Sequence, residues 1–316
     1  MPTQAKNMLM VAAVAAIAFH SAGAQSRKPT ANAGAGDKAS LASEDILDRA
    51  KTLRAAADAL GMVRWSDIGA GASRLPAVDV VNTMELWGSG TTYGSGQVYK
   101  PGAPWPAFKT EIHVALAYNP AAMRVEMTCT NSDASAQGGA APQHIIQVVR
   151  DKYAWDESEI GAGLVPGKGT ATPAMAADNN RLLRLWILPY GVVKAALASG
   201  DKTRTSTENG TMVITFPLSG QLAGVTVKAT LNAKNEVAKV ETRTDNPALG
   251  EMFTETEYSD YADHGEEILT EIKSPGHIVQ KRGGHPVLDI QVKKVDANNP
   301  YLVFPVPENV KNAAVH

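Results

Sequence analysis

Apolar and polar residues alternate with a period of two through much of the chain after residue 110, which is the pattern of β-strands with one buried face. The alternation is clearest in residues 111–118, 123–129, 212–216, 225–231 and 288–293. Asn119-Pro120 separates the first two of these runs and is typical of a hairpin loop. One apolar and one polar face on each strand predict an antiparallel sheet that is covered on a single side.

Two segments have helical spacing and are the candidates to cover that side. Apolar residues recur at this spacing from Ile46 to Leu60, with Ser43 as a plausible N-cap and Gly61 as a stop. The second segment runs from Asn180 to Ala198, and Pro189 predicts that it divides into two short helices. We therefore expect an α+β fold in which a strongly curved antiparallel sheet, a half-barrel, wraps helices on its concave face.

The N-terminus has the three parts of a secretory signal. Lys6 supplies a basic start, Met8 to Phe19 is apolar, and Ala22-Gly23-Ala24 is an A-x-A cleavage site. The apolar run is about a dozen residues, shorter than the ~20 that a membrane-spanning helix needs, so cleavage is favoured over an uncleaved anchor. We expect residues 1–24 to be a signal peptide and the protein to be periplasmic or secreted.

The remainder of the chain is expected to contain one domain. Residues 25–42 are small and polar, which indicates a disordered leader. With no internal repeat after them, we expect a single half-barrel-like domain over residues 43–310 and a tail over residues 311–316.

Charge and cysteine content limit the partners and the redox chemistry. The chain has 30 Lys and Arg against 32 Asp and Glu, a net charge of −2, which argues against a nucleic-acid partner. No later segment is long and apolar enough to predict a transmembrane helix. Cys129 is the single cysteine, so no intrachain disulfide is expected, and its place on an apolar strand face predicts a buried small hydrophobe.

The sequence gives little support for catalytic or metal-binding residues. His264, His277 and His285 form the one local histidine cluster, but their spacings of 13 and 8 residues match no compact zinc motif. Surface or loop positions are the preferred interpretation, and we expect no cofactor. Ser89 and Ser95 lie in Gly-Ser-Gly triplets that are better explained by a bend, bulge or hairpin end than by a nucleophile elbow.

Large aromatic residues are the better candidates for ligand contacts. They lie at predicted strand ends, in loops and on the second helical segment, and the set is Trp87, Trp105, Trp155, Trp186 and Tyr190. Their rings would line a site for an apolar or aromatic molecule, with Trp186 as the first choice. The alternative is ordinary packing in the core and at its rim.

Several segments in order carry a resemblance to a known protein module. They are Gly94-Ser-Gly-Gln97, the run from Tyr99 to Pro106, Asp151 to Trp155, Leu185 to Leu197, Asp245 to Gly250, and the stretch from Tyr258 to Pro307. The set resembles the N-terminal β-rich leader module of exported metallo-β-lactamase-fold hydrolases. That module resembles the half-barrel of periplasmic lipoprotein carriers of the LolA/LolB-like kind, which implies a pocket for an apolar ligand or acyl chain.

The chain departs from that pattern in two ways. The acidic connection over residues 263–271 is longer than expected, and no His-x-His-x-Asp-His stretch is present to carry the ligands of a catalytic zinc domain.

Our preferred interpretation is an exported, non-catalytic binding or carrier module for an apolar small molecule, a lipid or a partner protein. One alternative is an accessory or stranded N-terminal domain of a metallo-β-lactamase-fold hydrolase, acting with a separate hydrolase domain. A further alternative is a small zinc hydrolase that uses the three histidines.

Overall fold

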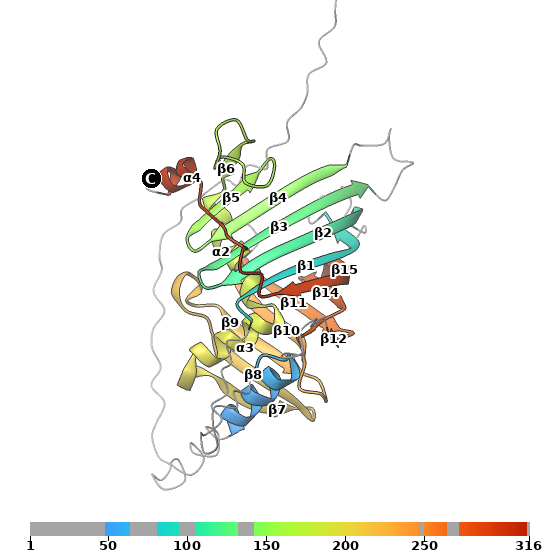
Figure 1. Ribbon diagram of the computed structural model, residues 1–316. Helices are drawn as coiled ribbons and strands as arrows, with labels where there is room; N and C mark the ends of the chain where they lie inside the picture. Colours follow the sequence, from blue (N-terminus) through green and yellow to red (C-terminus); the bar gives the residue numbers. More distant parts are fainter. Residues whose placement is uncertain are drawn as a thin grey trace, which may run out of the picture.

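The computed structural model describes residues 48–63, 81–94, 105–131, 142–246, 250–263 and 272–314. Figure 1 shows that a single large antiparallel sheet dominates the molecule. Its strands are β1 (Thr83–Tyr93), β2 (Ala107–Tyr118), β3 (Ala121–Asn131), β4 (Gln143–Arg150), β5 (Tyr153–Glu157), β6 (Ala171–Pro173), β7 (Arg204–Glu208), β8 (Thr211–Pro217), β9 (Thr226–Leu231), β10 (Val237–Asn246), β11 (Gly250–Ser259), β14 (His277–Arg282) and β15 (His285–Ala297).

Helices and short elements complete the described chain. They are a helix over residues 48–59, α2 (Asp178–Trp186), α3 (Pro189–Ala198), α4 (Glu308–Ala313), the 3₁₀ turns Met175–Ala177, Gly200–Lys202 and Gly220–Leu222, and a small hairpin of β12 (Ala262–Asp263) and β13 (Lys273–Ser274).

The strand order explains where the helices lie. Across the sheet the order is β6-β5-β4-β3-β2-β1-β15-β14-β11-β10-β9-β8-β7, and each neighbouring pair is antiparallel. The first six strands step outward from the centre to one edge, and the chain then crosses to the opposite edge before returning. Because α2 and α3 make that crossing, they lie over one face, which we call the inner face. There α2 packs on β3, β4 and β5, and α3 packs on β8.

The expected fold class is wrong in its shape. The sheet is antiparallel, as the alternation predicts, but it has 13 strands, is neither closed nor strongly curled, and carries few helices. Alternation specifies which side chains share a face, whereas strong curvature requires bulges or glycine kinks at repeated positions. The described strand pairings shift register at three places, at Trp87/Gly88, Val237/Lys239 and Gln280/Lys281. The sheet therefore remains open, with β6 and β7 as its edges.

The local sequence predictions agree with the described elements. The helix that ends before Gly61 is present from residue 48 onward, and Gly61 has the positive φ of 69° that a helix stop favours. Asn119 and Pro120 form the turn between β2 and β3. The second helical segment divides at Pro189 into α2 and α3.

The central pairing of β1 with β15 depends on two glycines. A Cβ atom at Gly90 would lie 2.0 Å from the Asp289 carbonyl oxygen, and one at Gly88 would lie 2.8 Å from the Gln291 carbonyl oxygen. The register shift between Trp87 and Gly88 falls at the same place. The Gly-Ser-Gly triplet around Ser89 is thus explained by a bulge, one of the three explanations expected from the sequence, together with a close backbone approach.

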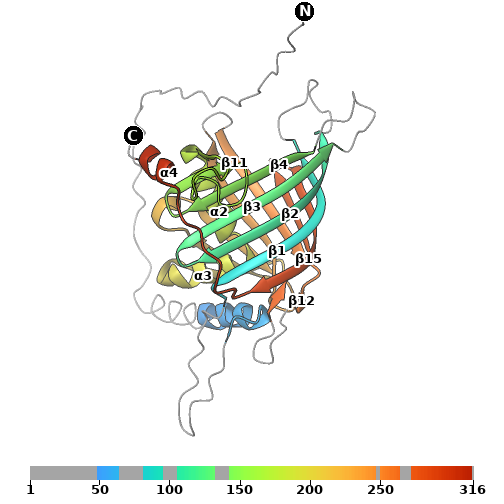
Figure 2. The ribbon, with the colours of Figure 1, turned by 45° about the horizontal axis from the view of Figure 1, so that its top comes forward.

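Apolar side chains are buried on both faces of the sheet. The main cluster lies on the inner face and includes residues from α2, α3 and the 48–59 helix, such as Leu185, Val192 and Leu53. A second cluster lies on the outer face, where Phe304 and Val310 of the C-terminal segment pack on strand residues. Figure 2 shows this segment, drawn in red, crossing β1 to β4 toward α4. The strands near β6 are therefore covered on both sides.

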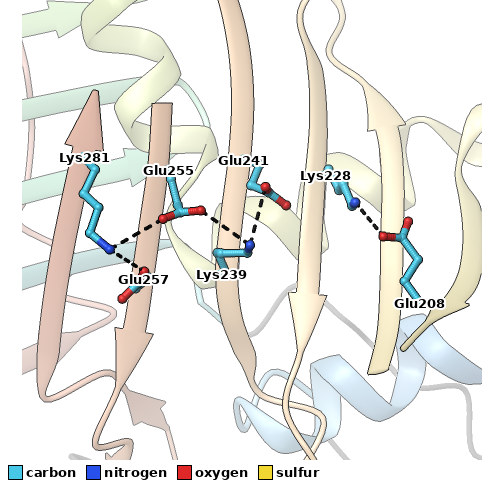
Figure 3. Close-up of polar contacts among 7 residues, drawn as sticks. All are labelled: Glu208, Lys228, Lys239, Glu241, Glu255, Glu257 and Lys281. Carbon is cyan, nitrogen blue, oxygen red and sulfur yellow. Dashed lines mark hydrogen bonds and ion pairs between the residues drawn. The ribbon is translucent and has the colours of Figure 1, made fainter. Parts of the chain in front are cut away.

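The outer face of the other half of the sheet carries paired charges instead (Figure 3). Lys281 Nζ lies 2.8 Å from Glu257 Oε1 and 3.6 Å from Glu255 Oε1, and Glu255 continues the row to Lys239 at 3.4 Å. Opposite charges on neighbouring strands stabilise their pairing modestly. They also keep this face polar and unsuited to burial.

The close approach at Gly90 predicts a large cost for any side chain there. Gly90→Ala should lower the free energy of unfolding by about 1–3 kcal/mol, because β1 must move away from β15 to admit a Cβ atom. Urea denaturation measures the difference, and Ser89→Ala, one residue earlier, is the matched control with little expected effect. Equal midpoints for the two variants would contradict the close approach.

The charge row predicts a pH-dependent contribution to stability. The hydrogen bond from Lys281 lowers the pKa of Glu257 from its ordinary 4.5, so the pair stabilises the fold above pH 4.5 and the contribution is lost as the pH falls through the lowered pKa. A double-mutant cycle of Lys281→Met and Glu257→Gln should therefore give a small coupling at pH 7 that disappears in strong acid and in high salt. A coupling that is unchanged in acid would refute this assignment.

Candidate functional site

A cavity of about 280 Å³ lies between the inner face of the sheet and the corner where α2 joins α3. Its walls come from β1, β2 and β3 in one half of the sheet and from β11, β14 and β15 in the other. The apolar side chains of the wall include Leu86, Val114, Met123, Met127, Ile278 and Ile290. The methionines are unbranched and polarisable, so this wall can adapt to the shape of an apolar guest.

The corner that forms the roof has a fixed backbone. Pro189 is the first residue of α3, where a proline's missing N–H and restricted φ favour helix initiation. A Cβ atom at Gly191 would lie 2.4 Å from the carbonyl oxygen of Leu185, so only glycine allows α3 to approach the end of α2 this closely. The roof is therefore a defined structural corner.

Two buried tyrosines attach this corner to the sheet and to the small hairpin. The Tyr258 hydroxyl on β11 donates a 2.8 Å hydrogen bond to the carbonyl oxygen of Ile187. The Tyr190 hydroxyl donates to the carbonyl oxygen of Lys273 and lies 3.1 Å from Ser274 Oγ. Burial raises the pKa of both tyrosines, so the hydroxyls remain protonated donors at neutral pH. Their role here is to hold the roof.

The other end of α2 is held by Arg181. This side chain is 5% exposed, and its Nη1 donates to the carbonyl oxygens of Val148 at 3.1 Å and Trp155 at 2.6 Å. Its Nη2 pairs with Asp156 Oδ1 at 2.6 Å. The guanidinium thus has a carboxylate partner and satisfies two strand carbonyls, which fixes the start of α2 over β4 and β5.

Two further arginines line the cavity and were not singled out from the sequence. Arg184 lies on α2 in the roof, and Arg282 lies at the end of β14 in the wall. Both are half-buried. The sequence contains one signal for Arg184: it lies three residues after Arg181, among the leucines of the second half of α2, so the two arginines fall on the same side of the helix.

The five aromatic residues predicted to bind a ligand do not gather around this cavity. Of the five, Tyr190 lines it. Trp186 instead lines a separate cavity of about 300 Å³, and the centroid of its ring lies 5.8 Å from that of the Tyr118 ring. Trp155 is buried in the outer-face cluster, and its Nε1 donates to Glu157 at 2.9 Å. Trp87 stacks on His113 with 4.5 Å between the ring centroids, and Trp105 stacks on His285 with 4.8 Å between the ring centroids.

The predicted histidine cluster is only partly within the described residues. His277 Nε2 lies 2.7 Å from Asp289 Oδ1 on the neighbouring strand, and His285 contacts Trp105. His264 lies outside the described residues. Within the described ranges, no group of three or more His, Cys, Asp or Glu side chains is arranged to hold a metal ion.

A search of the described residues found no helix of the length and apolarity needed to cross a membrane. Comparison of the chain with models of protein families, with curated proteins and with solved structures found no match. A functional conclusion therefore rests on the cavity and its lining.

The hydrogen bond of Tyr258 predicts how strongly the roof is held. Tyr258→Phe should lower the free energy of unfolding by about 1–3 kcal/mol, because the buried carbonyl of Ile187 loses its donor. Urea denaturation measures the change. Tyr301→Phe is the matched control, since Tyr301 is 88% exposed and should tolerate the substitution. An unchanged midpoint for Tyr258→Phe would show that this bond does not hold the corner.

Proposed function

We propose that this protein is an exported, non-catalytic binding or carrier module that encloses one chain of an apolar ligand, such as a lipid. The observation that carries the proposal is the cavity under the α2–α3 corner, whose described lining is predominantly aliphatic and thioether side chains. Concave sites with such walls and a few placed polar groups are the usual form of small-molecule sites.

The size of the cavity favours a single chain. Its volume of about 280 Å³ is near the lower end of the roughly 300–1,000 Å³ typical of small-molecule sites. One acyl chain or a molecule of similar bulk suits this space better than a lipid with two chains.

The polar groups of the lining favour binding over covalent chemistry. Among the described lining residues there is no His, Cys, Asp or Glu to act as a base, and Ser274 Oγ is within hydrogen-bond distance of the Tyr190 hydroxyl. Thr92 lies 2.7 Å from Thr110 through their hydroxyl oxygens. These hydroxyls are engaged in internal hydrogen bonds instead of forming a nucleophile with a base beside it.

The proposed compartment comes from the first 24 residues. Their basic start, apolar run and A-x-A site have the form of a secretory signal. A periplasmic or extracellular carrier would keep an apolar molecule out of water between membranes or at a surface.

Filling the cavity tests the proposal. Val114 lines it and is half-buried, so Val114→Phe should place a ring where the ligand chain would lie and weaken binding of the neutral probe N-phenyl-1-naphthylamine by about tenfold or more. Fluorescence titration measures the affinity, and urea denaturation confirms that the variant is folded.

The matched control is Val303→Phe, the same change at a residue that is 68% exposed and is not part of the lining. Saturable binding by the unmodified protein that survives in Val303→Phe and is lost in Val114→Phe is the expected result. No saturable binding by the unmodified protein would overturn the proposed function, and equal binding by both variants would place the probe elsewhere.

A further inference from the structure

The cavity contains two positive charges in an otherwise apolar lining. Arg184 projects from the roof and Arg282 from the wall, and they are the charged residues of the described lining. Neither has a carboxylate within 4.0 Å among the described residues. Arg184 Nη1 donates to the neutral amide oxygen Gln147 Oε1 at 3.1 Å. Both guanidinium groups therefore lack a described counter-ion.

The charges also act on each other. Burial, followed by the positive charges of Arg282 and Arg181, lowers the pKa of Arg184 from 12.5 to about 10. Burial also lowers the pKa of Arg282. Arg184 still carries its charge at neutral pH, so the cavity holds two like charges close enough to repel.

Two other cationic side chains on the same elements have carboxylate partners. Arg181, one helical turn before Arg184, is paired with Asp156 and two carbonyl oxygens. Lys281, the residue before Arg282, points to the outer face and pairs with Glu257. Nearby cations on the same elements thus have carboxylate partners, whereas the two cavity arginines have none described.

An unpaired, partly buried charge is costly, and two of the same sign cost more. A ligand that brings negative charge into the cavity removes this cost. The planar guanidinium group is suited to such a ligand, because it can donate two parallel hydrogen bonds to carboxylate or phosphate oxygens.

We infer that the ligand is an anionic amphiphile with a single chain, whose oxyanion head is bound by Arg184 and Arg282 and whose chain lies against the methionine and aliphatic wall. This inference rests on the proposed function, since it assigns the chemistry of the molecule in that cavity. A long-chain carboxylate is the simplest member of the class: its head offers two oxygens, and one chain suits the cavity volume.

Competition between two ligands that differ in the head alone tests the inference. Dodecanoate and dodecan-1-ol have the same chain, and each can be titrated against bound N-phenyl-1-naphthylamine at pH 8. The unmodified protein should bind dodecanoate about tenfold or more tightly than dodecan-1-ol. Arg184→Gln and Arg282→Gln should each remove most of that preference while leaving the affinity for dodecan-1-ol unchanged.

The matched control is Arg243→Gln. Arg243 is an exposed arginine that pairs with Glu251 at 2.5 Å, so this variant should retain the full preference for dodecanoate. Urea denaturation without ligand separates a binding role from a structural one. Removing an uncompensated charge should leave the midpoints of Arg184→Gln and Arg282→Gln unchanged or higher, and a large loss of stability in both would count against the inference.

The remaining outcomes separate the inference from the proposed function. If the unmodified protein binds the naphthylamine probe but binds dodecanoate and dodecan-1-ol equally, the anionic head is refuted and the apolar carrier stands. If inorganic phosphate displaces dodecanoate as effectively as a second anionic amphiphile does, the arginines form a free-anion site, and the inference of an amphiphile is overturned. If the probe does not bind at all, both proposals fail.

Discussion

The pairing of β1 with β15 is the constraint on which the rest of the structure depends. Along the described chain, β1 is the first strand and β15 is the last. Their pairing joins two antiparallel meanders into one 13-stranded sheet. Their backbones approach so closely that Gly88 and Gly90 have no space for a Cβ atom. Without this pairing the walls of the cavity would separate, because β1 to β3 lie on one side of the junction and β11 and β14 lie beyond β15 on the other.

The crossing of α2 and α3 over the inner face follows from the same arrangement. The chain leaves the sheet at one edge, β6, and must re-enter at the other, β7, so the intervening segment has to pass over the middle. Arg181 fixes the start of this crossing, and the hydroxyls of Tyr190 and Tyr258 fix its corner. A rigid corner over an open sheet leaves space that the side chains do not fill, and that space is the candidate site.

The distribution of charge differs between the outer face of the sheet and the cavity. On the outer face, lysines and glutamates of adjacent strands are paired (Figure 3). These pairs keep that surface polar and stabilise the pairing of the strands modestly. In the cavity, the arginines repel each other and have no described carboxylate. Natural folds retain such an arrangement at a cost in stability, and a bound anion is a physical reason to retain it.

Much of the local structure was predictable from sequence because it depends on neighbouring residues. Alternation predicted an antiparallel sheet and the positions of β2, β3, β8, β9 and β15. The Pro189 break predicted α2 and α3, and the glycines around Ser89 predicted a bend, bulge or hairpin end. The resemblance to a hydrolase leader module, the signal peptide and the periplasmic location stay predictions.

The pattern of apolar and polar residues could not predict the number of strands in the sheet, the modest curl of the sheet, or the position of the site. Trp155 and Trp186 are the same residue type but pack on opposite faces of the sheet. Arg184 and Arg282 are far apart in the sequence but line the same cavity. Periodicity assigns a side chain to a face of its own element, whereas long-range strand order decides which faces enclose a cavity and which charges are left there without a partner.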